Sequence, residues 1–108
     1  MSYRVTFTSK ALGELHEIAL WWSEHRDAEQ AAHWLEAFET AIRSLALNPE
    51  RHALARESDS FPFTLRQLLF GLRKRPTHRA VFRIQENNEV IVYGIRHVAQ
   101  EDFTPNDL

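Results

Sequence analysis

The sequence predicts a single α+β domain, residues 1–108, with an N-terminal strand, an αα-hairpin and a three-stranded antiparallel meander. Three observations carry this prediction. A short alternating pattern opens the chain, two helical apolar stripes follow it, and three strand-like segments close it. Because these strands cluster after the helices, they should form one sheet with the helices on one face. A length of 108 residues, 44% of them hydrophobic, suffices for one such domain.

The first strand and the first helix are predicted by two different periods. Tyr3, Val5 and Phe7 alternate with polar residues, which is typical of a strand with one buried face. Thr8 or Ser9 can then cap a helix that should end near His25. The apolar positions of this helix repeat at spacings of three and four, at Ala11, Leu12, Leu15, Ile18, Ala19 and Trp22.

A second helix is predicted between Asp27 and Asn48. Asp27 with Gln30 forms a variant of the capping box, and Pro49 ends the helix because it restricts the residue before it. The short joint makes the two helices an antiparallel hairpin. The second apolar stripe comprises Ala31, Trp34, Leu35, Phe38, Ala41, Ile42 and Leu45.

The rest of the chain is predicted to be a loop followed by three strands. Pro49 to Pro62 is polar and aperiodic, which indicates a surface loop. Thr64 to Leu72, Arg79 to Gln85 and Val90 to His97 are the predicted strands. Asn87-Asn88 should form a hairpin turn, because asparagine tolerates positive φ. The sheet should be largely antiparallel, and its face opposite the helices is expected to stay uncovered.

Composition excludes several kinds of protein. The chain has no cysteine, so disulfides, thiol catalysis and thiolate metal sites are excluded. Met1 to Thr8 lacks the apolar run of a signal peptide, and no stretch approaches the ~20 apolar residues of a membrane span. The six histidines are dispersed. We therefore expect a cytoplasmic protein that uses no metal, no cofactor and no membrane.

The charges are unevenly distributed along the chain. Residues 1–59 carry six Lys/Arg and ten Asp/Glu, residues 60–85 carry six Lys/Arg and no acid, and residues 86–108 carry one Arg and five acids. The segment charges of −4, +6 and −4 add to the net charge of −2. A basic block of this kind indicates an acidic or polyanionic partner, although a solvated basic face has the same composition.

The predicted order of elements resembles the RelE/ParE toxin superfamily over essentially the whole chain. The resemblance lies in the order and spacing of short segments and in the total length. These segments are Tyr3-Arg4-Val5-Thr6-Phe7-Thr8, Leu45-Ala46-Leu47-Asn48-Pro49-Glu50-Arg51, Leu65-Arg66-Gln67-Leu68, His78-Arg79-Ala80-Val81-Phe82-Arg83-Ile84 and Val92-Tyr93-Gly94-Ile95-Arg96-His97.

The resemblance implies the toxin of a type II toxin–antitoxin pair, neutralised by a separately encoded antitoxin that wraps its surface. Three functions stay open at this point. RelE-like members cleave mRNA in the ribosome without a metal, whereas ParE-like members lack that catalytic set and poison DNA gyrase. A third alternative is an inactive relative that only binds its antitoxin.

The candidate catalytic residues for RNA cleavage are Arg79, His97 and Glu57. The resemblance places Arg79 on a central strand, where a guanidinium can hold a phosphate through two parallel hydrogen bonds. His97, with an ordinary pKa of ~6.5, suits either proton-transfer role, and the alternative is a structural or antitoxin-facing residue. Glu57 in the central loop is a weaker candidate for the general base. Strand alternation places Arg79 on the face away from the helices, where we expect it to be exposed and its truncation to cost little stability.

The candidate RNA-binding residues are the basic run Arg73, Lys74 and Arg75 at a strand–strand turn, together with Arg83 and Phe103. RelE-like toxins carry a pair of central lysines and a C-terminal tyrosine that have no counterpart here. Phe103, the nearest aromatic residue, can stack on a base but cannot donate a proton. We expect the antitoxin to dock over the helix pair and against the basic sheet region, covering Arg79.

Overall fold

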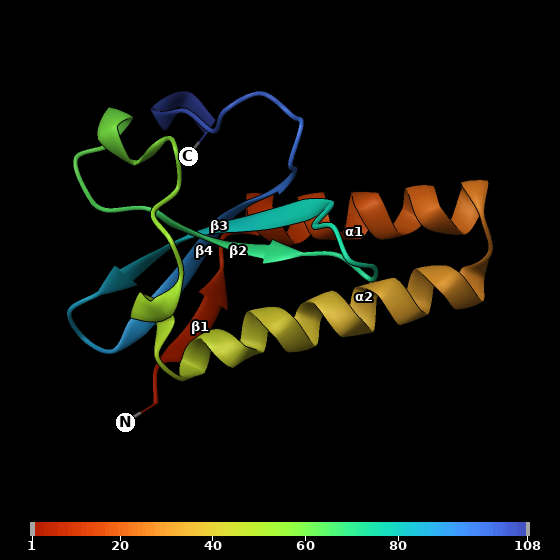
Figure 1. Cartoon of the computed structure of the whole chain (residues 1–108), viewed down its shortest axis with the longest axis horizontal. Coiled ribbons are helices and arrows are strands. Elements are labelled where there is room, and N and C mark those ends of the chain that lie inside the picture. Colours follow the sequence, from red (N-terminus) through yellow and green to blue (C-terminus); the bar gives the residue numbers. More distant parts are fainter. Residues whose placement is uncertain (1, 108) are drawn as a thin grey trace.

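The computed structural model describes residues 2–107, which fold into two helices and one sheet (Figure 1). The elements in chain order are β1 (Arg4–Phe7), α1 (Ser9–His25), α2 (Ala28–Arg43), β2 (Arg66–Phe70), β3 (His78–Gln85) and β4 (Glu89–His97). Short 3-10 helices lie at Ser44–Ala46, Pro49–Arg51, Ser58–Ser60 and Pro105–Asp107. The predicted α+β architecture is confirmed. None of these helices within residues 2–107 is long and apolar enough to cross a membrane.

The sheet has the strand order β1-β4-β3-β2. The pairs β2–β3 and β3–β4 are antiparallel, as predicted for the meander. β1 pairs in parallel with β4, because the helix pair separates these two strands and lets the chain cross over between them. The β3–β4 hairpin turns at Asn88, which has a φ of 59°, so the turn predicted at Asn87-Asn88 is confirmed.

Both helices begin at the predicted caps. The side chain of Thr8 accepts a hydrogen bond from the Ala11 amide at 3.1 Å, and Asp27 Oδ1 accepts one from the Gln30 amide at 2.7 Å. α2 ends at Arg43, earlier than predicted, and continues as a 3-10 helix. The chain then turns away at Asn48, whose φ of 48° is left-handed.

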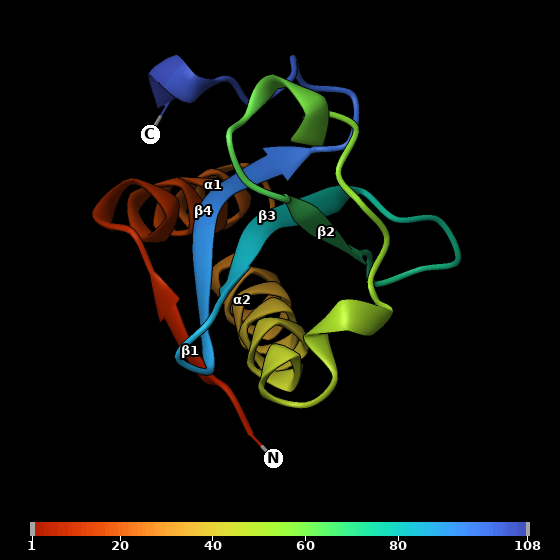
Figure 2. The ribbon, with the colours of Figure 1, turned by 90° about the vertical axis from the view of Figure 1, so that its left-hand side faces the viewer.

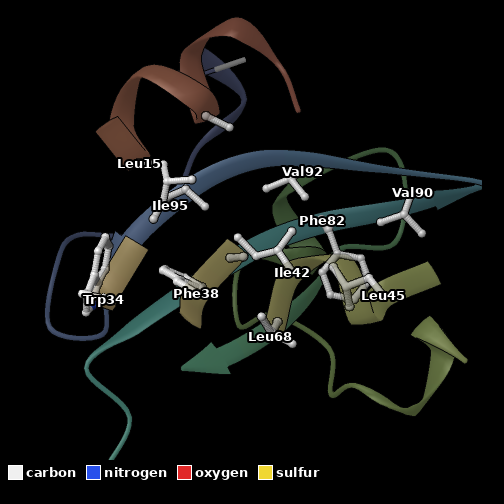
Figure 3. Packing of buried hydrophobic residues seen from close by; sticks show 12 residues of the cluster. Leu15, Trp34, Phe38, Ile42, Leu45, Leu68, Phe82, Val90, Val92 and Ile95 are labelled. Carbon is white, nitrogen blue, oxygen red and sulfur yellow. The ribbon is translucent and has the colours of Figure 1, made fainter. Parts of the chain in front are cut away.

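The main core lies between the helices and one face of the sheet (Figure 3). Its members come from α1, α2, the 3-10 helix that follows α2, and strands β2, β3 and β4. They include Leu15, Trp34, Phe38, Ile42, Leu45, Leu68, Phe82, Val90, Val92 and Ile95. The residues that the two apolar stripes predicted to be inward-facing therefore supply most of the helical half of this core.

A second, smaller core covers the opposite face of the sheet. It contains Ala55, Phe61, Leu65, Val81 and Phe103, which are all buried. In Figure 2 the loop that carries Phe61 and the C-terminal segment lie together at the top of the view, with α2 below. The expectation that this face stays uncovered is wrong, because Val81 lies on it and apolar residues of two loops pack there.

Candidate functional site

Arg79 and Glu57 form a buried ion pair beneath this second core. The Nη1 atom of Arg79 donates to Glu57 Oε1 at 2.8 Å, and its Nη2 atom donates to Glu57 Oε2. Arg79 is 1% exposed and Glu57 is 3% exposed. Arg79 also donates to Gln67 Oε1 at 3.2 Å, and the Phe103 amide donates to Glu57 Oε2 at 2.9 Å. The pair thus joins β3, the central loop and the C-terminal segment.

The surroundings of Glu57 keep its carboxylate charged. Burial alone would raise the pKa of Glu57, but the hydrogen bonds from Arg79 and from the Phe103 amide outweigh burial and lower the pKa. A carboxylate with a lowered pKa that already accepts these hydrogen bonds is a poor general base. Alternation did place Arg79 away from the helices, as predicted, but it is not exposed there.

Arg96 lies next to Arg79 on the same face of the sheet, and sequence reasoning did not single it out. The two arginines are partners in the β3–β4 register. Arg96 is buried, with its guanidinium 5.3 Å from the centre of the Phe103 ring and 3.4 Å from Asp107 Oδ2. Arg96 alternates with Gly94 along β4, which places both residues beneath the C-terminal segment. This alternation is the feature of the sequence that could have identified Arg96.

His97 lies on the opposite, helix-facing side of the sheet. Its exposed ring is 5.3 Å from that of His78, and its Nδ1 accepts a hydrogen bond from the Ala99 amide at 3.1 Å. His78 in turn packs against Trp34, at 5.2 Å between ring centres. The structure therefore brings Arg79 and Glu57 together but separates His97 from them by the thickness of the sheet.

His78 is buried, although along the sequence it is one of several dispersed histidines. Burial, with a smaller contribution from the charge of His97, lowers the pKa of His78 to about 4. Its ring is hydrogen-bonded to the Thr77 hydroxyl at 2.8 Å. The period of two that places Ala80 and Phe82 in the main core also includes His78. This alternation could have predicted the burial of His78.

The lowered pKa of His78 predicts a pH-dependent stability. Below pH ~6.5 the unfolded chain protonates this histidine, whereas the folded chain does so only near pH 4. Stability is therefore lost as the pH falls through this window, by about 2 kcal/mol between pH 7 and pH 5. Urea unfolding at both pH values should show this loss in the wild type and not in His78→Phe. An equal loss in His78→Phe would assign the pH dependence to other groups.

The candidate RNA-binding residues fall into two groups. Arg73, Lys74 and Arg75 are exposed at the tip between β2 and β3, as predicted. Arg83 instead places its guanidinium 4.2 Å from the centre of the Phe63 ring. Phe103 is 1% exposed and packs in the second core, so in this arrangement it cannot stack on a base.

The exposed cationic tip is held in shape by its own backbone. The Thr77 amide donates to the Phe70 carbonyl at 2.9 Å, which closes the connection between the two strands. A Cβ at Gly71 would lie 2.4 Å from the Arg75 carbonyl oxygen, so the tight return of the chain requires glycine at this position. Within residues 2–107 no group of three or more His, Asp or Glu side chains could hold a metal ion.

Comparison with known proteins identifies the family. The model of the ParE toxin of type II toxin–antitoxin systems, parDE, matches residues 5–102. The chain belongs to this family. It is the toxin of a type II toxin–antitoxin system, and its partner is a cognate antitoxin.

Two solved structures share the fold of this ParE-family toxin. A chain of the chromosomal ParDE system from P. aeruginosa is 22% identical, with a TM-score of 0.70, and the match covers 90% of this chain and 97% of that one. A chain of the toxin–antitoxin complex RelBE2 from Mycobacterium tuberculosis is 23% identical, with a TM-score of 0.55 and coverage of 93% and 95%. No curated protein sequence matches the toxin.

The burial of Arg79 corrects the predicted antitoxin docking mode in one respect. The toxin's own central loop and C-terminal segment occupy the sheet face above Arg79. An antitoxin bound to the folded toxin therefore cannot cover Arg79 directly. The exposed basic tip at Arg73 to Arg75 stays accessible, and so do exposed residues of the helix pair such as Leu20 and Trp21.

Proposed function

We propose that this ParE-family toxin arrests growth without cleaving nucleic acid, by poisoning DNA gyrase through protein contacts. The choice of gyrase follows the resemblance to ParE-like toxins. The choice of a non-catalytic mechanism rests on one observation, the buried ion pair between Arg79 and Glu57. Arg79 is the candidate cation for RNA cleavage, and Glu57 is the weaker of the two candidates for the base, after His97.

The separation of the three candidate catalytic residues supports this choice. Cleavage by a 2′-hydroxyl needs a base, an acid and a cation that meet the substrate at one place. Arg79 and Glu57 satisfy each other under the cover of the second core, and His97 lies across the sheet from them. A toxin that binds a target protein needs no such convergence, only an exposed surface.

The test compares the two activities with the same purified toxin. We expect it to inhibit the supercoiling of relaxed plasmid by DNA gyrase and to leave cleaved DNA trapped on the enzyme. In a translating extract, mapped mRNA ends should be those of the untreated control. Ribosome-dependent mRNA cleavage without an effect on gyrase would overturn the proposal in favour of a ribonuclease. Absence of both activities would mean a relative that only binds its antitoxin.

His97→Gln separates the mechanisms further. An endoribonuclease that used His97 as acid or base should lose roughly 10²- to 10⁴-fold of its activity in this variant. Under our proposal, growth arrest in cells without antitoxin should stay within about twofold of the wild type, because the imidazole moves no proton. A loss of growth arrest at normal protein level and melting temperature would argue against the proposal.

A further inference from the structure

An open hollow of about 640 Å³ lies beside the β3–β4 hairpin, on the sheet face that carries the second core. We call it the hairpin hollow. Its lining includes Phe63, Arg83, Gln85, Glu86 and Asn87. The β3–β4 turn is at the left of Figure 1, and the basic tip that precedes β3 is at the right. The hairpin hollow is therefore a part of the surface separate from the basic tip.

A ladder of aromatic rings fixes the side chain of Arg83 in this hollow. The guanidinium lies 4.2 Å from the centre of the Phe63 ring. Phe63 stacks on Tyr93 at 5.7 Å between centres and contacts Phe61 at 5.6 Å. Phe61 is buried and stacks on Phe103 in the second core. The guanidinium is thus oriented by rings that the core itself holds in place.

Arg83 is held in position but has no anion. It is half-buried, and it forms no ion pair and no side-chain hydrogen bond with residues 2–107. Stacking occupies one face of the guanidinium and leaves the five N–H donors in its plane unused. An apolar side chain would cover Phe63 equally well, so the packing does not account for the charged fork.

We propose that the hairpin hollow is the contact site for the target protein and that Arg83 binds a carboxylate of that protein. A guanidinium holds a carboxylate through two parallel hydrogen bonds, and an arginine among aromatic side chains has the composition of an interface hot spot. Because the rings already orient Arg83, little conformational entropy is lost on binding. The inference rests on the proposed function, since it assigns the hollow to the protein that the toxin poisons.

A single carboxylate of a protein fits this hollow better than the phosphates of a nucleic acid. Among residues 2–107, Arg83 is the only cation in the lining, and the exposed Glu86 balances its charge. Binding to a phosphate backbone draws its strength from several cations acting together. The amide side chains of Gln85 and Asn87 can instead form hydrogen bonds with a polypeptide on either side of one acidic residue.

The experiment measures how the toxin inhibits the supercoiling of relaxed plasmid by purified DNA gyrase. Arg83→Met keeps an apolar stem over Phe63 and removes the donors, so the toxin concentration for half-inhibition should rise about 30-fold. Arg83→Lys should raise it about fivefold, because an ammonium keeps the charge but not the planar fork. Both variants should melt within a few degrees of the wild type, since Arg83 lies at the edge of the core.

Phe63 is a positioning residue in this proposal. Phe63→Leu removes the ring that orients the guanidinium and should raise the concentration for half-inhibition about tenfold. In Arg83→Met/Phe63→Leu the loss should be no greater than in Arg83→Met alone, because the ring acts through the arginine. Losses that multiply in the double variant would contradict this role.

Arg26→Met is the matched control. Arg26 also places its guanidinium over an aromatic ring, 5.7 Å from the centre of Trp22, and it forms no ion pair within residues 2–107. It lies by the α1–α2 turn, at the right of Figure 1 and away from the hairpin hollow. Inhibition of gyrase by this variant should stay within about twofold of the wild type.

Growth arrest in cells without antitoxin, binding of the cognate antitoxin and binding of fluorescent plasmid DNA are measured in parallel. We expect Arg83→Met to lose growth arrest and to bind the antitoxin and the DNA like the wild type. Inhibition of gyrase and growth arrest at wild-type level in Arg83→Met would overturn the inference. Weaker binding of the antitoxin alone would assign the hollow to the antitoxin, and weaker binding of DNA without gyrase would make it a nucleic-acid site.

The same measurements distinguish this inference from the proposed function. A wild-type toxin that arrests growth without inhibiting gyrase would contradict the proposed function. Loss of growth arrest in Arg83→Met, with antitoxin and DNA binding retained, would then still support the hollow as the contact site for a different target protein. Inhibition of gyrase by the wild type and equally by Arg83→Met would contradict the inference and leave the proposed function standing.

Discussion

Arg79→Ala is expected to lower the free energy of unfolding by about 3–5 kcal/mol, because it leaves the Glu57 carboxylate buried without its cation. A small domain has a total stability of roughly 5–15 kcal/mol, so this loss removes a large part of it. Urea unfolding monitored by tryptophan fluorescence measures the loss. The sequence predicts an exposed Arg79, whose truncation would lower the stability only slightly. The burial of Arg79 makes the expected loss much larger.

The double variant Arg79→Met/Glu57→Leu separates the charge from the packing. Replacing both members of a buried ion pair with apolar residues is often neutral or stabilising, so this variant should regain most of the lost stability. Arg83→Ala is the control, since that arginine only stacks on Phe63 and should cost about 1 kcal/mol or less. A loss below 1 kcal/mol in Arg79→Ala would show that the pair is solvated in the native protein.

The double variant also tests the mechanism, because it is expected to stay folded and any loss of activity would not come from unfolding. Under the proposed gyrase mechanism it should still arrest growth, because neither residue contacts the target. A ribonuclease that used Arg79 to hold phosphate would be inactive in the same stable variant. Loss of growth arrest in Arg79→Ala alone does not distinguish the mechanisms, since a strongly destabilised toxin loses activity whatever its mechanism.

Local patterns were sufficient to predict the elements of the fold. Thr8 and Asp27 cap the two helices where a short polar side chain precedes an apolar stripe, and Asn88 turns the hairpin through its left-handed φ. These features depend on residues a few positions apart. The parallel pairing of β1 with β4 was not predicted, because it joins residues about 85 positions apart with no local signal.

The candidate site was predicted less well, for a related reason. Alternation correctly placed Arg79 on the face away from the helices, but nothing local showed that Phe61 and Phe103 fold over it. The loop from Pro49 to Pro62 is polar on average, yet Glu57 and Phe61 within it are buried. Their burial depends on the C-terminal segment, whose Phe103 amide binds Glu57, so no window of sequence contains the whole arrangement.

Phe103→Ala is expected to cost about 3–5 kcal/mol, the usual range for removing a fully buried phenylalanine. The ring is stacked on Phe61 at 5.7 Å between centres and closes the second core. The remaining tethers of the C-terminal segment include the hydrogen bond from the residue 103 amide to Glu57 and ion pairs such as the exposed Arg56–Asp102, which is worth about 1 kcal/mol or less. These pairs cannot replace the lost contact, so the segment should detach from the sheet.

Hydrogen exchange and a double-mutant cycle together test this role of Phe103. In Phe103→Ala, amides of the C-terminal segment should exchange faster than those of β3 and β4, in addition to the loss of global stability. Gly94→Ala should destabilise the wild type, because its Cβ would lie 3.0 Å from the Phe103 ring, and should cost less once the ring is removed. Additive effects of the two substitutions would show that the ring does not press on Gly94. Unchanged exchange in the segment would show that ion pairs and backbone contacts alone hold it over Arg79.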